Sequence, residues 1–150
     1  MKIQVKRQIK APAEALWKYL GDYANIHRFH PLLKGSYFNE GTESCEIGST
    51  RQCDLKNGDY LKERITEWNE GSSYSVEIYE TSMPVKSATA TLAVKPIDKN
   101  NSEVSMDISM EAKHAIMAPI MYLSFRYSVA PGILKGLDKL YHQENKIALA

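Results

Sequence analysis

The sequence has few cysteines, no long apolar run and little net charge, and each of these absences excludes a class of protein. Only two cysteines occur, Cys45 and Cys53, and they form no C-x-x-C motif, so free thiols are expected. The longest apolar run, residues 115–123, is about half of what a bilayer crossing needs. A formal net charge of +1, with lysines and arginines spread along the chain, does not indicate nucleic-acid binding.

Motifs of nucleophilic catalysis and of metal binding are also missing. There is no G-x-S-x-G sequence and no cysteine next to a histidine, so a nucleophilic enzyme is not expected. His27 and His30 are three residues apart, but no third ligand has a fixed spacing to them, whereas zinc needs three or four ligands. We expect neither a metal nor a cofactor. The His30-Pro31 pair is expected to end a helix, with His30 at the helix end or at a pocket mouth.

The start of the chain favours a cytoplasmic protein. Residues 2–11 enter an alternating strand pattern at once, and no apolar stretch follows a basic start. The chain has 150 residues and 43% apolar residues, which is enough for one domain with its own core. We therefore expect residues 1–150 to form a single domain.

Two short helices are predicted after this first strand. Residues 11–23 change to a helical period, with Leu16 and Leu20 on one apolar stripe. A glycine closes that helix, and Asp22 is expected to cap a second short helix at residues 23–29.

The rest of the chain predicts a series of strands and then a long helix. Alternating segments are separated by Gly, Asn, Asp and Pro. They predict six antiparallel strands, at residues 34–40, 46–55, 59–68, 73–80, 85–96 and 102–112. The last ~36 residues return to a helical period that is broken or bent near Pro119 and Pro131.

These elements predict an α+β fold in which a curved antiparallel sheet of about seven strands wraps around the long C-terminal helix. A sheet of this size curls under its own twist. The apolar stripe of the helix, which includes Phe125, Val129, Ile133 and Leu137, must be buried, and the concave face of the sheet is the only large partner. Such an arrangement can leave a cavity between the sheet and the helix.

Five segments, in this order, resemble the SRPBCC superfamily of helix-grip proteins. They are APAEALWKYLGDYANIHRFHP, IGSTR, LKERI, MPV and GLDKL. The superfamily includes polyketide cyclase/dehydrase-like, START-related and birch-pollen-allergen-type proteins. The resemblance covers nearly the whole chain and implies a seven-stranded sheet around the C-terminal helix, with an apolar pocket between them. It implies no single chemistry, because the superfamily contains lipid carriers, hormone receptors and cyclases.

The apolar faces of two strands are predicted to form one wall of this pocket. Alternation places these residues inward: Ala88, Ala90, Leu92, Val94, Val104, Met106, Ile108 and Met110. Ala88 and Ala90 leave space where a closed core would prefer bulk; alternatively, the helix approaches the sheet closely there. The resemblance favours a ligand wall. The hormone-receptor branch of the superfamily has a tyrosine and a serine at these two positions, so its ligand is not expected here.

Arg51 and Glu63 are the most informative polar residues. If Lys56-Asn57-Gly58 forms a hairpin loop with a left-handed Gly58, Arg51 faces Glu63 across two strands on the concave side. Buried charges are rare unless they are paired or used. In the hormone-receptor branch the matching arginine and glutamate line the polar end of the pocket, and Lys34 falls where that branch has its anchoring lysine. The alternatives are a structural ion pair, or a one-residue slip of register that turns both outward.

The predicted ligand-binding residues come from the strands, one loop and the C-terminal helix. They are Lys34, Arg51, Cys53, Leu61, Glu63, Val76, Ile78, Met83, Pro84, Ala88, Ala90, Met106, Ile108, Met121, Phe125, Val129 and Ile133. Alternation also places Ile47 on the inward face with Cys53. Glu63, Arg51 and His30 are the candidates for catalysis.

The predicted function is to bind a small, mostly hydrophobic ligand with one polar end, such as a lipid, polyketide or aromatic metabolite. One alternative is a polyketide cyclase or dehydratase in which Glu63 acts as acid or base and Arg51 polarises a carbonyl. Another is a quinone- or lipid-handling protein that docks on another protein or on a membrane, which requires an exposed apolar patch. We expect the partner to be the small molecule and not nucleic acid, and the chain to be a monomer or weak homodimer.

Overall fold

The computed structural model describes residues 1–39, 41 and 44–149, with the side chains of 147–149 excepted, and is built on one antiparallel sheet. Its strands are β1 Lys2–Ile9, β2 Leu33–Phe38, β3 Thr50–Leu55, β4 Tyr60–Asn69, β5 Ser73–Thr81, β6 Val85–Pro96 and β7 Ser102–Ala112. Their order across the sheet is β1-β7-β6-β5-β4-β3-β2. The predicted seven-stranded sheet is confirmed. The strand predicted at 34–40 ends at Phe38, and Glu40 lies outside the described residues.

Two short helices follow β1, as predicted. They are α1, Ala13–Leu20, and the 3-10 helix η1, Tyr23–Arg28. Pro12 precedes the first of them in extended backbone. The carboxylate of Asp22 makes no capping hydrogen bond to the described backbone of η1; it accepts hydrogen bonds from the side-chain amide of Asn25 instead. The prediction that Asp22 caps this helix is therefore wrong, because its carboxylate binds the side chain of Asn25 and not the N–H groups of the helix.

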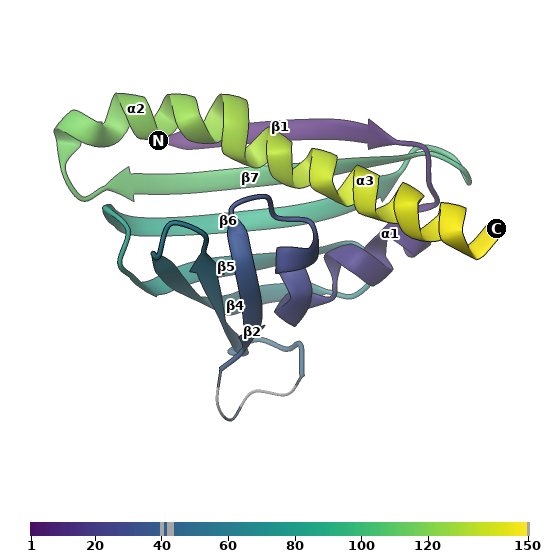
Figure 1. The fold of residues 1–150 in the computed structure, drawn as a ribbon, viewed down its shortest axis with the longest axis horizontal. Helices are drawn as coiled ribbons and strands as arrows, with labels where there is room; N and C mark the ends of the chain where they lie inside the picture. The colour runs from purple at the N-terminus through teal and green to yellow at the C-terminus, as the bar shows by residue number, and fades with distance from the viewer. Residues whose placement is uncertain (40, 42–43, 150) are drawn as a thin grey trace.

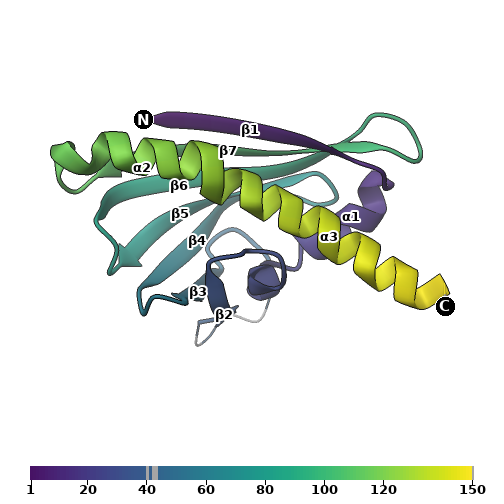
Figure 2. The ribbon, with the colours of Figure 1, turned by 45° about the horizontal axis from the view of Figure 1, so that its top comes forward.

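The C-terminal helix is continuous but changes its winding along its length. The 3-10 turn η2, Ala115–Met117, leads into α2, Ala118–Ser124, then the π-helical turn η3, Phe125–Val129, and finally α3, Ala130–Leu149. Pro131 explains the π turn, because proline has no N–H for the carbonyl four residues earlier and its ring crowds that carbonyl. Figures 1 and 2 show the helix running across the sheet beside β1 and β7, with its C-terminal end beyond α1.

The core fills the space between the sheet and this helix. The inward residues predicted for β6 and β7 are buried, except that Ala90 is partly exposed. The prediction for Ile47 is wrong: this side chain was expected to face inward with Cys53, but it is 70% exposed. The reason is that β3 begins only at Thr50, so Ile47 lies in the turn before the strand, where alternation does not apply.

The C-terminal half of the helix, α3, is packed tightly against η1 and its end. A Cβ atom added to Gly136 would lie 2.0 Å from the carbonyl oxygen of Phe29, so only glycine allows this approach. Glu144 of α3 also pairs with Arg28 of η1. These contacts hold α3 over the end of the sheet that the short helices cover. The helix-grip architecture predicted from the sequence is confirmed.

Candidate ligand-binding cavity

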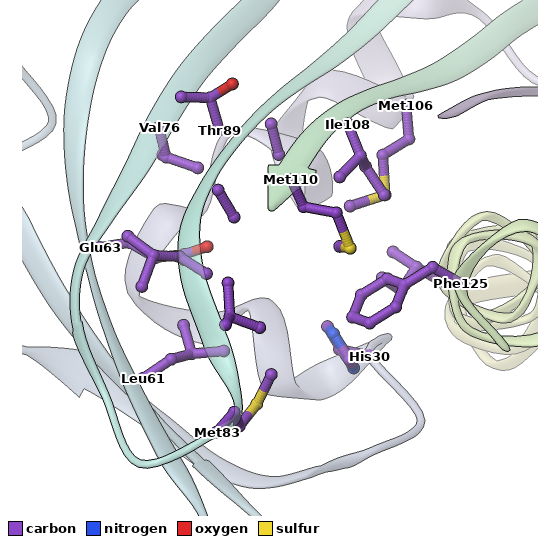
Figure 3. A pocket seen from close by; sticks show the side chains of 15 residues that line it. His30, Leu61, Glu63, Val76, Met83, Thr89, Met106, Ile108, Met110 and Phe125 are labelled. Carbon is purple, nitrogen blue, oxygen red and sulfur yellow. The ribbon is translucent and has the colours of Figure 1, made fainter. Parts of the chain in front are cut away.

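A cavity lies between the sheet and the C-terminal helix, and Figure 3 shows side chains from several strands and the helix pointing into it. The larger of two chambers has a volume of about 80 Å³. The predicted ligand-binding residues that line it are Leu61, Glu63, Val76, Ile78, Met83, Ala88, Ala90, Met106, Ile108, Phe125 and Ile133. His30, a candidate for catalysis, lines it as well. The chamber is an apolar space whose ionisable lining groups are a carboxylate and an imidazole.

A smaller chamber of about 50 Å³ adjoins the first, because both share His30, Glu63 and Ala90 among their lining residues. Arg51 and Cys53, which were predicted to bind ligand, border this smaller chamber. The cavity therefore consists of two adjoining chambers at different ends. The larger chamber lies under the π turn of the helix, and the smaller one reaches the ion pair at the base of β3 and β4.

Four predicted ligand-binding residues do not line either chamber. Lys34 on β2 is exposed to solvent, so the lysine suggested by the receptor resemblance does not reach the cavity. Pro84 is next to Met83 in the loop before β6 but does not border the space. Met121 and Val129 are buried against the core instead. They lie on the inward side of the helix, on which Phe125 and Ile133 are the residues that reach the larger chamber.

Val85 and Thr89 line the larger chamber although the sequence did not indicate them as ligand-binding residues. A β-bulge between Val85 and Ser87 interrupts the register of β6 against β7. The bulge brings Val85 and Ala88 to the same side, which simple alternation from the start of the strand would not do. Met110 also borders the chamber, and alternation had placed it on the inward face of its strand.

The register around Arg51 and Glu63 is as predicted. The backbone of Gly58 is left-handed, with φ +96°, and Arg51 is paired with Glu63 across β3 and β4. Nε of Arg51 donates a hydrogen bond to Oε2 of Glu63 at 2.6 Å, and Nη2 lies 2.6 Å from the same oxygen. Arg51 is 1% exposed and Glu63 9%. Two opposite charges are thus buried together at the inner end of the cavity, where each offsets the cost of burying the other.

A backbone carbonyl and two aromatic rings also contact the guanidinium of Arg51. Its Nη1 donates to the carbonyl oxygen of Tyr23 at 2.8 Å. The ring of Tyr23 lies 4.1 Å from the guanidinium carbon and that of Tyr74 5.8 Å, both within the range of cation–π attraction. No pattern in the sequence indicates that Tyr23 is a partner of Arg51, since the two are 28 residues apart in different elements.

The two carboxylate oxygens of Glu63 have different surroundings. Oε2 takes both contacts from Arg51. Oε1 has no hydrogen-bond partner within the part of the chain that the structure describes, and Glu63 lines both chambers. A carboxylate oxygen can only accept hydrogen bonds while it is ionised. The inner end of the cavity therefore offers one open acceptor in an otherwise apolar space.

His30 is held as a neutral donor at the border of the same space. Burial, together with the positive charge of Arg51, lowers the pKa of His30 to about 4. Its Nδ1 accepts a hydrogen bond from the backbone N–H of Leu32 at 3.3 Å, so the neutral ring carries its proton on Nε2. Nε2–H has no partner among the described residues. His30 is therefore more than the end of a helix, because it is a cavity residue with an open donor.

His27, the other histidine of this corner, has a structural role. It is partly buried, and its Nδ1 lies 2.8 Å from the hydroxyl oxygen of Ser36. Among the described residues no three His, Cys, Asp or Glu side chains come together as metal ligands would. No described helix combines the length and the apolar character that spanning a membrane would require.

Comparison with known proteins agrees with this geometry. A profile of the family described as polyketide cyclase/dehydrase and lipid transport matches residues 1–141. No curated protein matches the chain in sequence. An uncharacterized protein from Bacillus thuringiensis is a structural relative with 19% identity and a TM-score of 0.79, covering 95% of this chain and 99% of that one.

Two further structures have the same fold. A protein from Thermobifida fusca has 22% identity and a TM-score of 0.80, with 95% of this chain and 93% of that one covered. A START superfamily protein from Mycobacterium smegmatis has 12% identity and a TM-score of 0.81, with 95% and 97% covered. The predicted SRPBCC resemblance is confirmed, and the chain belongs to the polyketide cyclase/dehydrase and lipid transport family.

Proposed function

We propose that the cavity binds a small, mostly apolar ligand whose polar end donates a hydrogen bond to Glu63. The observation that carries this proposal is the open oxygen Oε1 of Glu63, which faces an apolar chamber while Oε2 is bonded to Arg51. An ionised carboxylate oxygen at the border of an apolar space forms a strong hydrogen bond with a donor that reaches it. An O–H or N–H group of a ligand would supply the missing donor. The family description, which includes lipid transport, and the START-type relative support an apolar ligand.

The same geometry disfavours a ligand carboxylate. The guanidinium of Arg51 is already neutralised by Glu63 and is bonded to Tyr23, so it is not a free anchor for an anion. A carboxylate brought to Oε1 would add a second negative charge in a space of low polarity, which is costly without a cation to pair with it. We therefore expect phenols, alcohols and amines to bind better than carboxylic acids of the same shape.

The cavity has to enlarge to take such a ligand. The larger chamber of about 80 Å³ is smaller than the ~300–1,000 Å³ of typical ligand pockets. Three methionines line it, Met83, Met106 and Met110, and their unbranched side chains change shape at little cost. Phe125 borders it from the π turn of the helix, where the winding is irregular. These residues are where we expect the wall to yield.

Fluorescent and competing ligands test the proposal. 1-Aminoanthracene is an apolar probe with an N–H donor, and we expect saturable binding with increased fluorescence. 2-Naphthol should displace it at a concentration at least about tenfold lower than 2-naphthoate at neutral pH, which corresponds to about 1.4 kcal/mol. Glu63→Gln, checked for folding by circular dichroism, should remove this preference, because an amide also offers a donor and carries no charge.

A matched pair of variants tests whether 1-aminoanthracene binds inside the cavity. Ala90 lines both chambers, so Ala90→Phe should fill the space and abolish binding. Ser87 is exposed on the same strand and points to the other side, so Ser87→Phe should leave binding unchanged. Equal effects of the two variants, or the absence of saturable binding to the unmodified protein, would contradict the proposal.

A second candidate function is enolisation of a ketone in the same chamber. The observation that favours it is the pairing of an open acceptor, Oε1 of Glu63, with an open donor, Nε2–H of His30, in one lining. The carboxylate would take a proton from the carbon next to the carbonyl, and His30 would donate a hydrogen bond to the carbonyl oxygen. We assign that second role to His30 and not to Arg51, which is bonded to Glu63 and Tyr23.

The enolisation candidate has its own test. 2-Tetralone in deuterated buffer loses its α-proton signals as they exchange, and the protein should accelerate this loss if Glu63 acts as a base. Glu63→Gln should return the rate to that of buffer, and His30→Phe should reduce it. Binding of 2-tetralone without any acceleration would leave the ligand-binding function and exclude this candidate.

A further inference from the structure

The outward face of the first part of the C-terminal helix carries a row of exposed apolar side chains, which we call the outer stripe. It consists of Ile116, Ile120, Leu123 and Tyr127, which are 88%, 70%, 56% and 68% exposed. Their spacing of four, three and four residues places them on one face of a helix. Single exposed apolar residues are normal, but a continuous row is typical of a surface that binds something.

The same stretch of helix turns its other face to the interior. Met121 is buried, and Phe125 lines the larger chamber, where Figure 3 shows its ring projecting from the helix toward the other lining side chains. A single layer of helix therefore separates the cavity from the outer stripe. A binding partner on the stripe would lie directly over the part of the wall that has to move.

The segment of chain that carries the outer stripe has charged residues of one sign. Residues 112–137 contain no Asp or Glu, but they contain Lys113, Arg126 and Lys135. None of these three cations forms an ion pair within the part of the chain that the structure describes. The outer stripe is thus an apolar row bordered by unpaired positive charge.

We propose that the outer stripe docks on a lipid surface of net negative charge. A helix that lies on a membrane has apolar side chains on one face, Lys or Arg beside them and no excess of acidic groups. Tyrosine suits the boundary between lipid tails and water, because its ring is apolar and its hydroxyl is polar. Tyr127 ends the stripe at this boundary, and Arg126 lies over its ring, with the guanidinium 5.2 Å from the ring centre.

A second copy of the chain fits this surface less well. A symmetric contact brings the same patch of two molecules together. The cations Lys113 and Arg126 of both copies would then lie in one interface, and no acidic residue in 112–137 is present to pair with them. Such like-charge contacts oppose association. An anionic lipid surface supplies the negative charge that the chain itself lacks here.

The π turn and Pro131 give α2 a place to bend away from α3. Irregular winding next to a proline is a common cause of helix kinks. A docked α2 could then uncover the chamber toward lipid, and this consequence rests on the proposed ligand-binding function. The docking itself does not, because it requires only the outer stripe and its charges.

Vesicle co-sedimentation tests the docking with the full chain and no added ligand. We expect the protein to sediment with vesicles of phosphatidylcholine and phosphatidylglycerol and much less with phosphatidylcholine alone. Ile120→Glu should weaken binding about tenfold or more, since it removes one buried isoleucine from the contact and adds a negative charge. Ile47→Glu is the matched control, because both isoleucines are 70% exposed and only Ile120 belongs to the outer stripe.

Further variants and conditions separate the charge from the apolar contact. Arg126→Gln should reduce the preference for phosphatidylglycerol, and added salt should weaken binding to the anionic vesicles. Failure of the protein to sediment with either vesicle would overturn the proposal, as would equal weakening by Ile120→Glu and Ile47→Glu. Sedimentation velocity showing a dimer that Ile120→Glu dissociates would assign the outer stripe to a second copy instead. Because no ligand is present, these outcomes are independent of the binding of 1-aminoanthracene.

Discussion

The two halves of the C-terminal helix face the same sheet but are packed very differently. In α3, Ile133, Leu134 and Leu137 are at most 1% exposed, and Gly136 touches the backbone of η1's end. In α2, Met121 is the one residue with a buried side chain, and Ile120 is 70% exposed. The C-terminal part of the helix, α3, is therefore firmly packed and anchors it, whereas α2 covers the cavity with few buried side chains; we call α2 the thin cover.

The interior beneath the two halves differs in the same sense. The smaller chamber ends at Arg51, which is fixed by Glu63, a backbone carbonyl and aromatic rings. The larger chamber is bordered by Phe125 of η3 and by flexible methionine side chains. A rigid polar end can orient a ligand, and a yielding apolar end can admit it. We take this asymmetry to be the basis of binding.

The largest expected effect comes from breaking the ion pair at the rigid end. Arg51→Met leaves the carboxylate of Glu63 buried without its partner and should lower the free energy of unfolding by about 3–5 kcal/mol. The double variant Arg51→Met/Glu63→Leu should recover much of this loss, because no charge is then left unpaired. Urea denaturation of the two single variants and the double variant measures the coupling. Effects that simply add would show that the two residues do not stabilise each other.

The next effect concerns the anchor itself. Gly136→Ala places a Cβ 2.0 Å from the carbonyl oxygen of Phe29, so the helix must shift, and we expect a loss of about 3 kcal/mol. Gly132→Ala is the control on the same helix, since its Cβ would meet only a ring atom of Pro31, at 3.2 Å. It should change stability by less than about 1 kcal/mol, because alanine also favours the helix. Similar losses in both variants would mean that α3 is not anchored at Gly136.

A smaller effect depends on pH and tests the environment of His30. Its pKa is lowered from 6.5 to about 4, so an unfolded chain takes up a proton in this range and the folded chain does not. The stability that His30 contributes is complete above about pH 6.5 and is lost as the pH falls toward 4, with a loss of about 3 kcal/mol. His30→Phe cannot titrate and should lose less stability on acidification than the unmodified protein. Parallel losses between about pH 7 and 4.5 would show an ordinary, hydrated histidine.

The smallest effect is expected at the thin cover. Leu123→Ser should change the free energy of unfolding by less than about 0.5 kcal/mol, since the side chain is 56% exposed and outside the core. Leu137→Ser, four turns along the same helix where the side chain is fully buried, is the contrasting change and should cost several kcal/mol. A large loss from Leu123→Ser would mean that α2 is as firmly packed as α3.

The sequence predicted the parts of the molecule that depend on local patterns. Alternation located the inward faces of β6 and β7, and a glycine in the turn between β3 and β4 was enough to predict that Arg51 faces Glu63. A hairpin register follows from a few neighbouring residues, which is why this pair could be found without a structure. The helix-grip fold followed from the order of the elements.

Properties that depend on distant residues could not be predicted in this way. Lys34 matched a position in a receptor resemblance, but β2 turns it to solvent. The inward placement of Ile47 was wrong because the strand predicted from residue 46 starts only at Thr50. The partner of Arg51 at Tyr23 and the open oxygen of Glu63 depend on how η1 packs against β3, which no local pattern contains. The volume of the cavity depends on all of these contacts together.

The most direct test of ligand binding in the cavity uses the six methionines of the chain as reporters. Met83, Met106 and Met110 line the larger chamber, whereas Met1, Met117 and Met121 do not line either chamber. In a spectrum of the protein labelled with 13C at the methionine methyl groups, addition of 1-aminoanthracene should shift the first three signals and give them contacts to the ligand protons. The other three should change little. Shifts confined to Met1, Met117 and Met121, with the cavity signals unchanged, would contradict binding between the sheet and the helix.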